Sequence, residues 1–213
     1  IVCGCDVQSR FIVSGFQSFK ALSPQECRPF DASRCGLNLG EAAATVVYVA
    51  KDRTQSGGWI LRSGAVRNDA SHISGPSRTG EGSYRALRHV TAGIAVEDLA
   101  FISAHGTATP YNDEMESIAI ERAGLLGVPV NSFKGYYGHT MGAAGVLECI
   151  LSMHAFDRGL IPATRGFGTL GVSRPVDVSA AVRDVPPRAR GFVKLISGFG
   201  GCNAAALFLK GGE

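Results

Sequence analysis

Apolar residues along the chain fall into short runs and longer helical stretches separated by polar, glycine-containing segments. The short runs predict strands at residues 1–5, 41–51, 59–66, 100–105 and 128–132, with a closing antiparallel pair at 191–197 and 204–210. The longer stretches predict helices at 10–22, 83–92, 113–123 and 141–156. The first strand is expected to be buried. Strands that alternate with long helices indicate an α/β fold built around a layered sheet.

Helix ends and a domain boundary can also be placed from local signals. Ser23-Pro24 is expected to end the first helix, because proline disfavours a helical conformation in the residue before it. The helix expected from Asp113 would carry Glu114 and Glu116 in its first turn, at the positive end of the macrodipole. A polar break at residues 55–58 is interpreted as the main internal boundary, and residues 68–82 as a polar loop.

Composition narrows the class of protein. The 213 residues are 45% hydrophobic and 18% charged, which excludes a disordered chain, and a net charge of +3 gives no reason to expect nucleic acid as a partner. The longest apolar stretches, at 41–50 and 142–151, contain or adjoin charges and are shorter than the roughly 20 residues of a membrane span. A soluble protein without a membrane partner is therefore predicted. Ile1 lies in an apolar run without a preceding Met, which suggests a piece of a longer protein.

Six cysteines lie along the chain without a repeated spacing. Reduced thiols in a cytoplasmic protein fit this pattern better than a disulfide scaffold. Cys3 and Cys5 are too close together for a zinc knuckle and would share one face of a strand, so no metal site is predicted.

Three polar motifs carry the candidate chemistry. His105 begins HGTATPYND directly after a predicted strand, Lys134 and His139 lie five residues apart in KGYYGHTMGAAG, and the turn GFGG begins at Gly198. Ends of strands in α/β sheets are where sites usually collect. Two imidazoles, an ammonium group and a turn that exposes backbone N–H groups suit carbonyl chemistry with a developing oxyanion.

In this order the motifs resemble those of β-ketoacyl-acyl-carrier-protein synthases of the thiolase-like superfamily, with most similarity to the stand-alone elongating enzymes of type II fatty acid or polyketide synthesis. Residues 15–40 also resemble that family. The resemblance implies an α-β-α-β-α layered fold in the complete enzyme, of which this chain would supply the C-terminal half. Residues 1–58 would then be the end of the N-terminal half and residues 59–213 the C-terminal half.

The resemblance also implies a reaction and roles for individual residues. In the family a cysteine takes the acyl chain, malonyl-carrier protein loses carbon dioxide, and the resulting carbanion attacks the thioester to give a 3-ketoacyl product. His105 and His139 would donate hydrogen bonds to the malonyl thioester oxygen, and Lys134 would set the electrostatics and pair with Glu116. The backbone N–H of Phe199 would complete an oxyanion hole and its ring would act as a gate, in a turn that Gly198 and Gly200 permit.

Further positions would serve the carrier protein and the acyl chain. Thr107 and Thr109 would contact the phosphopantetheine arm of acyl carrier protein, with no other cofactor expected, and Lys20 would contact the carrier protein itself. The loop at residues 68–82 aligns with a mobile loop near the acyl pocket, and His72 within it is expected not to be catalytic. Ser197 replaces a phenylalanine of many elongating members.

The nucleophilic cysteine of the family lies in a DTACSS-like segment that is absent here. Cys202 stands where the family has Thr or Ser and is interpreted as a packing variant. The expected partners are acyl carrier protein, the missing N-terminal half, and a second subunit in a homodimer or a ketosynthase-type heterodimer. One alternative stays open, a non-catalytic partner subunit of the chain-length-factor type.

Overall fold

A mixed sheet of six strands forms the centre of the computed structural model, which describes residues 1–50 and 57–211. The strand order is β3-β10-β9-β4-β5-β7. These strands are β3 (Trp59–Asn68), β4 (Leu99–Ser103), β5 (Pro129–Asn131), β7 (Asp177–Val178), β9 (Gly191–Gly198) and β10 (Cys202–Lys210). β10 is antiparallel to both β3 and β9, whereas β4 is parallel to β9 and β5.

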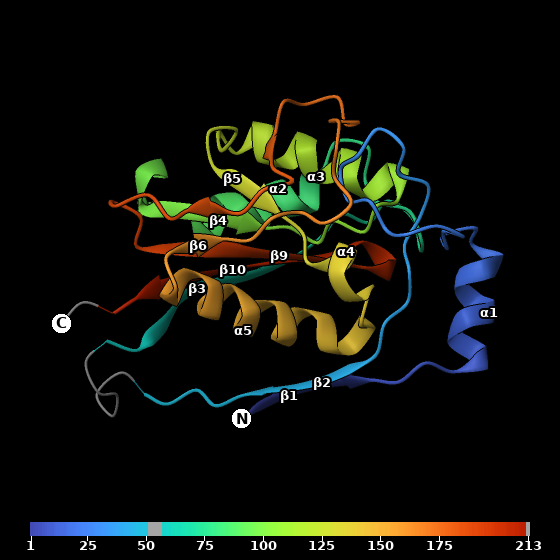
Figure 1. Ribbon diagram of the computed structural model, residues 1–213, viewed down its shortest axis with the longest axis horizontal. Coiled ribbons are helices and arrows are strands. Elements are labelled where there is room, and N and C mark those ends of the chain that lie inside the picture. The colour runs from blue at the N-terminus through green and yellow to red at the C-terminus, as the bar shows by residue number, and fades with distance from the viewer. Residues whose placement is uncertain (51–56, 212–213) are drawn as a thin grey trace.

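Helices cover both faces of this sheet (Figure 1). α2 (Glu81–Val90) and α3 (Pro110–Arg122) lie on one face, and α5 (Ala144–Asp157) lies on the other. β4 is buried along its whole length, because Leu99 and Ile102 pack into the α2–α3 core while Ala100 and Phe101 pack into the α5 core. Burial on both faces explains the continuous apolar run LAFIS of this strand.

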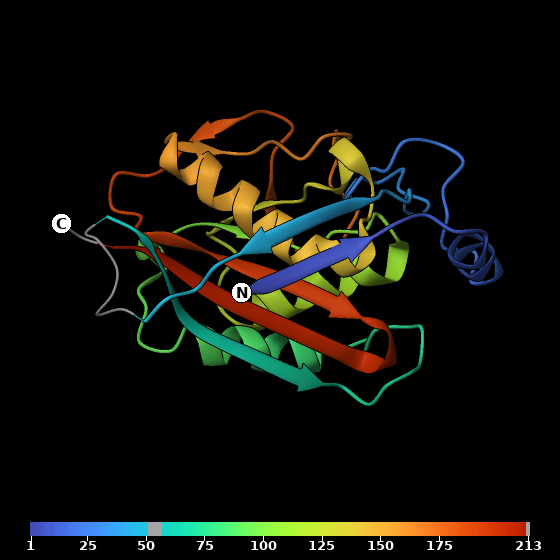
Figure 2. The ribbon, with the colours of Figure 1, turned by 90° about the horizontal axis from the view of Figure 1, so that it is seen from below.

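A separate two-stranded ribbon forms a further layer. β1 (Val2–Asp6) pairs antiparallel with β2 (Ala42–Val46), and the ribbon lies against α5 on the side away from the central sheet (Figure 2). The order of layers is therefore α2–α3, central sheet, α5, ribbon. The prediction that the first strand is buried is wrong, because β2 is the only strand neighbour of β1 among the described residues and the side chains of β1 range from half-buried to exposed.

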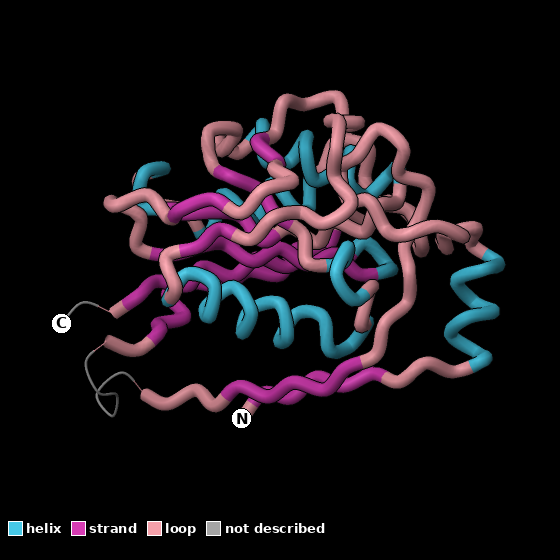
Figure 3. Tube along the Cα trace, in the orientation of Figure 1, coloured by secondary structure: helices cyan, strands magenta, loops and turns pink. Residues whose placement is uncertain are grey.

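The remaining elements are short and connect these layers. α1 (Arg10–Ser18) begins at the N-cap Ser9, whose hydroxyl accepts the Ile12 N–H. α4 (Lys134–Tyr137) and the 3-10 helix η3 (Met141–Ala143) lead into α5, and η4 (Phe199–Gly201) forms the turn between β9 and β10. Between α5 and β9 the chain runs mostly as loop, with only β6 (Leu160–Ile161), β7 and β8 (Arg183–Asp184) (Figure 3). Another 3-10 turn, η2 (Val96–Asp98), precedes β4.

Most predicted elements are present, with corrected bounds. The first helix ends at Ser18, and the helix expected from Asp113 begins at Pro110, so that Asp113 occupies the first turn instead of Glu114 and Glu116. α4 was not predicted. The strand expected at 41–51 ends at Val46, and Lys51 and residues 55–56 of the predicted boundary lie outside the described residues. Within the described ranges, no helix is long and apolar enough to cross a membrane.

Candidate active site

Two histidines face each other at the end of β4. His105 follows this strand by two residues, and His139 follows α4 by two residues. Their ring centroids are 4.9 Å apart with an interplanar angle of 81°. Both rings line a cavity of about 830 Å³. The structure thus brings together two motifs that the sequence places more than thirty residues apart.

Both imidazoles are held neutral. Burial lowers the pKa of His105 well below its usual value, and the positive charges of Lys134 and Lys194 act in the same direction. The same two causes lower the pKa of His139. The Nδ1 atom of His139 accepts the backbone N–H of Met141 at 3.1 Å, which leaves its proton on Nε2. Nδ1 of His105 is fully buried, so Nε2 is the nitrogen that can face the cavity.

The main chain of His105 is held from two sides. Its N–H donates to Oε1 of Glu116 at 2.7 Å, and its carbonyl oxygen accepts from Nζ of Lys134 at 2.6 Å. The next N–H, of Gly106, donates to Oε2 of Glu116 at 2.7 Å, and the Gly106 carbonyl accepts from the Ser132 hydroxyl at 2.7 Å. These contacts fix the direction in which the His105 side chain leaves the backbone.

The predicted ion pair between Lys134 and Glu116 does not form. Nζ of Lys134 instead lies 2.8 Å from Oε1 of Glu148, and both side chains are fully buried. Burial by itself would raise the pKa of Glu148, but Lys134 and Lys194 outweigh it, so the pKa lies below the usual range. Glu116 is engaged by backbone N–H groups, whereas the counter-charge of Lys134 comes from α5.

Two residues of this cluster, Glu148 and Lys194, were missed by the sequence analysis. Glu148 lies in the apolar run AGVLECILS of α5, and Lys194 lies between Val193 and Leu195 in β9. Nζ of Lys194 is 2.5 Å from Oε2 of Glu148. The available signal was one charge of each sign, each inside an otherwise apolar segment, because such charges are rarely buried unless they are paired.

Asp113 and Glu116, two acidic residues of α3 near the histidines, accept hydrogen bonds from several N–H groups. Asp113 accepts from the N–H groups of Phe30 at 2.8 Å and Ala108 at 3.2 Å, and thereby ties residue 30 to the turn after His105. Burial raises the pKa of Asp113 to about 6 and that of Glu116 to about 7, against the lowering effect of these hydrogen bonds.

Phe199 lies at the mouth of the cavity. Its ring is stacked on Phe16 at 5.5 Å and meets Phe19 edge-on at 5.3 Å, and 51% of the residue is exposed. Gly200 next to it has a φ of +79°, a value that L side chains rarely adopt, whereas Gly198 is extended with a φ of −119°. Of these two predicted glycines, only Gly200 is required by its backbone conformation.

The other predicted residues line the same cavity, including Thr107, Thr109, Lys20, His72 and Ser197. The hydroxyls of Thr107 and Thr109 lie 2.8 Å apart. Ser197 donates to Oδ1 of Asn203 at 3.0 Å, and Nδ1 of His72 accepts the Ser74 N–H at 3.2 Å.

The cysteines fall into two groups. Cys27 and Cys149 are buried, which raises the pKa of their thiols to about 12 and about 11, so these thiols stay protonated. Cys202 is exposed and lies outside the set of residues that line the cavity, so its interpretation as a packing variant is wrong in this chain. In the described part of the chain no group of three or more His, Cys, Asp or Glu side chains is arranged to hold a metal ion.

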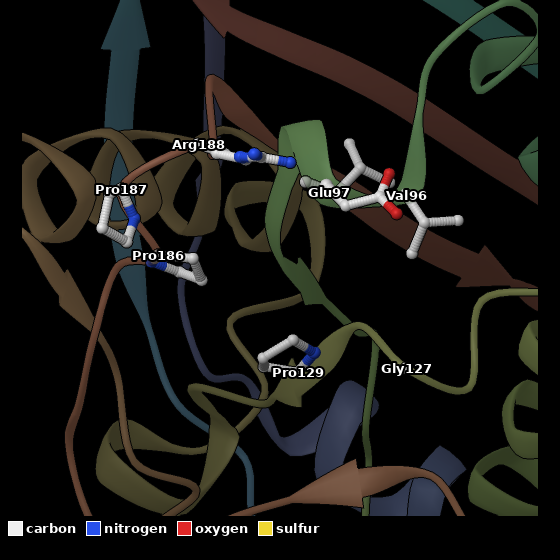
Figure 4. A pocket seen from close by; sticks show the side chains of 8 residues that line it. Val96, Glu97, Gly127, Pro129, Pro186, Pro187 and Arg188 are labelled. Atoms are coloured by element: carbon white, nitrogen blue, oxygen red, sulfur yellow. The ribbon is translucent and has the colours of Figure 1, made fainter.

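A second depression, of about 620 Å³, lies at the N-terminal ends of β4 and β5, whereas His105 follows the C-terminal end of β4 (Figure 4). Glu97 and Arg188 are the charged residues of its lining, which otherwise consists of prolines, glycine and aliphatic side chains. None of the predicted site residues belongs to its lining.

Comparison with known proteins agrees with this arrangement. Residues 58–168 match the model of the β-ketoacyl synthase C-terminal domain, which is more than half of the chain. The chain belongs to the β-ketoacyl synthase family. It is 32% identical over 92% of its length to nodulation protein E of Rhizobium meliloti and 33% identical over 94% to a 3-oxoacyl-[acyl-carrier-protein] synthase 2 of the same species, strain 1021.

Solved β-ketoacyl synthase structures share the fold. A ketosynthase in complex with its chain length factor from Xenorhabdus doucetiae superposes with a TM-score of 0.84 at 30% identity, covering 97% of this chain and 52% of the other. The chain covers 51% of each of the two Rhizobium proteins, and so spans about half the length of the curated relatives it matches. The predicted thiolase-like α/β fold of a C-terminal ketosynthase half is confirmed.

Proposed function

We propose that this chain carries the decarboxylation side of a 3-oxoacyl-acyl-carrier-protein synthase, an acyltransferase that condenses malonyl-carrier protein with an acyl thioester in fatty acid or polyketide synthesis. The observation that supports this proposal is the pair of neutral histidine rings, 4.9 Å apart, on one cavity. Two neutral N–H donors directed at one point can stabilise an oxyanion without themselves being deprotonated.

The proposed chemistry uses the Nε2–H groups of the two histidines as donors. The malonyl thioester carbonyl oxygen would accept hydrogen bonds from His105 and His139. As the bond between the malonyl carboxylate and the α-carbon breaks, carbon dioxide leaves and the electron pair forms an enolate whose negative oxygen both donors stabilise. The α-carbon of the enolate then attacks the acyl thioester carbonyl, and the acyl-bearing thiolate is the leaving group. That thiolate belongs to a cysteine outside this chain.

Residues around the cavity mouth suit a carrier-bound substrate. Thr107 and Thr109 would bind amides of the phosphopantetheine arm, since hydroxyls both donate and accept. Lys20, at the same mouth, would meet the acidic surface of acyl carrier protein. Phe199, half exposed against Phe16 and Phe19, would complete the oxyanion hole with its N–H and gate the acyl chain with its ring.

The proposed assembly is a cytoplasmic dimer, in which this chain is completed by an N-terminal half that supplies the nucleophile. The partner subunit would be a second copy or a chain-length-factor-type subunit. The similarity to a ketosynthase that is bound to its chain length factor supports this class of partner.

Release of carbon dioxide from malonyl-carrier protein tests the proposed function. In the complete protein, His105→Ala and His139→Ala should each abolish release, because one donor cannot stabilise the enolate as two do. His72→Ala is the matched control, since His72 lines the same cavity but is expected to take no part, and it should retain release. Carbon dioxide release that survives either substitution at the histidine pair would refute the assignment and favour a non-catalytic subunit.

A further inference from the structure

Lys194 is a second buried lysine beneath the histidine pair. Its side chain is 3% exposed in the middle of β9, and its ammonium group is surrounded by oxygen atoms. Nζ donates to the carbonyl oxygens of Ser103 at 3.1 Å and Ala104 at 2.9 Å, and it lies 2.5 Å from Oε2 of Glu148. All these partners are themselves buried.

This arrangement contains one more positive charge than a buried ion pair requires. Lys134 and Glu148 already neutralise each other at 2.8 Å, so Lys194 gives the three-residue cluster a formal charge of +1. A buried charge costs free energy unless it is paired and hydrogen-bonded, and apolar residues of similar size are often as stable in its place. Stability alone is therefore a poor explanation for a lysine between Val193 and Leu195.

The contacts of Lys194 continue into the backbone of the site. The carbonyls of residues 103 and 104 accept from Lys194, that of His105 accepts from Lys134, and that of Gly106 accepts from Ser132. Four consecutive carbonyl groups at the end of β4 are thus held by side-chain donors. Glu148 connects the two lysines, because one of its carboxylate oxygens contacts each ammonium group.

We propose that Lys194 is a positioning residue of the condensing site. Together with Lys134 it clamps Glu148 and the end of β4, which orients His105, and it places a net positive charge beneath both imidazoles. That charge disfavours an imidazolium and favours negative charge on the enolate oxygen, so the two histidines act as neutral donors at physiological pH. This proposal deepens the proposed function and rests on it for its catalytic consequence.

Other ionisable groups lie around the histidines and Lys194. Lys134 from α4 and Lys194 from β9 lower the pKa of both imidazoles directly. Glu148 and Cys149 from α5 act on Lys194, and Glu116 from α3, which accepts the N–H of His105, is acted on by Asp113 and Lys194. Cys149 keeps its thiol proton and so carries no charge near neutral pH. Removal of the Lys194 charge would therefore leave the negative groups less opposed and raise the pKa of both imidazoles.

Counting charges gives a test in the complete protein. Lys194→Met reduces the cluster from +1 to 0, and Lys194→Gln does the same while it keeps a donor for the carbonyls. In both variants we expect the pKa values of the two imidazoles, followed by NMR of labelled histidine without substrate, to rise by about one unit. The acid limb of the carbon dioxide release profile should move to higher pH by the same amount. The double variant Glu148→Gln/Lys194→Met restores +1 and should return both values toward the wild type.

Lys210→Met makes the same change in the neighbouring strand β10, at a partly exposed ion pair with Asp157, and should leave histidine titration and the pH profile unchanged. If Lys194→Met does not fold, Lys194→Gln carries the measurement. Unchanged histidine titration in a folded Lys194 variant overturns the proposal, whether or not the protein releases carbon dioxide. If the histidine pKa values shift in the Lys194 variants but the wild-type protein releases no carbon dioxide, the proposed function is refuted and the positioning role of Lys194 is not.

Discussion

The carboxylate of Glu116 accepts the backbone N–H of His105 at 2.7 Å, although the two residues lie on different elements. Its second oxygen accepts from the Gly106 N–H at 2.7 Å and from Nδ2 of Asn112 at 2.8 Å. Both carboxylate oxygens are thus occupied by donors, in a site without solvent exposure. An amide in this position would put its own N–H₂ group against at least one of these donors.

Glu116→Gln should therefore destabilise the protein by about 1–3 kcal/mol, the cost of leaving a buried donor unpaired. Urea unfolding at a pH well above the pKa of about 7 that burial gives Glu116, where the wild-type group is a carboxylate, would measure this change. Glu121→Gln on the same helix is the matched control, because its partner Arg174 is 43% exposed and the pair should contribute less than about 0.5 kcal/mol. Equal losses of unfolding free energy in the two variants would show that the hydrogen bonds from the His105 and Gly106 N–H groups to Glu116 contribute little to stability.

The neutral histidines predict a pH dependence of stability. The pKa of His139 is lowered in the folded chain, whereas an unfolded histidine titrates near 6.5, so the unfolded state binds more protons below that pH. The contribution of His139 to the unfolding free energy should accordingly decrease as the pH falls, by about 1.4 kcal/mol at pH 5.5, whereas the raised pKa values of Asp113 and Glu116 act in the opposite direction. His139→Gln removes only the histidine contribution, so the variant should lose less stability than the wild type, or gain more, between pH 7 and 5. An identical slope in urea unfolding of wild type and variant would contradict a neutral His139.

The turn after Phe199 allows backbone strain to be separated from a steric clash. Gly200 and Gly201 both have positive φ values, of +79° and +75°. A Cβ at Gly200 would meet open space, whereas one at Gly201 would lie 2.4 Å from Oδ1 of Asp69, which anchors the 68–82 loop. Gly200→Ala should cost about 1–2 kcal/mol from the torsion alone, and Gly201→Ala about 1–3 kcal/mol more. Thermal unfolding of the two variants compares these costs. Equal losses of stability would show that the 68–82 loop moves to accommodate a Cβ at position 201 without further cost.

Ser197 predicts an effect on acyl selection that depends on the proposed function. Its side chain lines the cavity that Phe199 also lines. Ser197→Phe should narrow this space and reduce kcat/KM for long acyl-carrier substrates roughly tenfold relative to short ones. Ser197→Ala loses the hydrogen bond to Asn203 without adding bulk and should leave the ratio unchanged. A long-to-short ratio that stays at the wild-type value in Ser197→Phe would place the acyl chain elsewhere.

How far the sequence predicts this molecule differs between its parts. Apart from β7, which was not predicted, the strands of the central sheet and the helices α2, α3 and α5 follow local apolar patterns, and they were predicted because each pattern reports burial on one or both faces. The histidine pair was predicted because both residues lie in polar, glycine-rich motifs after strands. Exposure of β1 could not be predicted, since it depends on which layer packs against a strand rather than on the strand itself.

The charged cluster behind the histidines shows a second limit. The family resemblance implied a pair between Lys134 and Glu116, but both carboxylate oxygens of Glu116 accept hydrogen bonds from backbone N–H groups, which no sequence pattern displays. Glu148 and Lys194 lie inside segments that otherwise read as core. Their partnership arises from the contact between α5 and β9, which is a tertiary property.

The position of α5 between the central sheet and the β1–β2 ribbon has a consequence for engineering. Only His154 and Asp157, at its C-terminal end, are exposed, whereas the other residues of the helix are buried or half-buried. The β1–β2 ribbon contacts the side of α5 that an ordinary surface helix would present to solvent, so substitutions on that side also meet protein. Labels, tags and solubilising charges therefore belong on α1, all of whose residues are at least partly exposed, and not on α5.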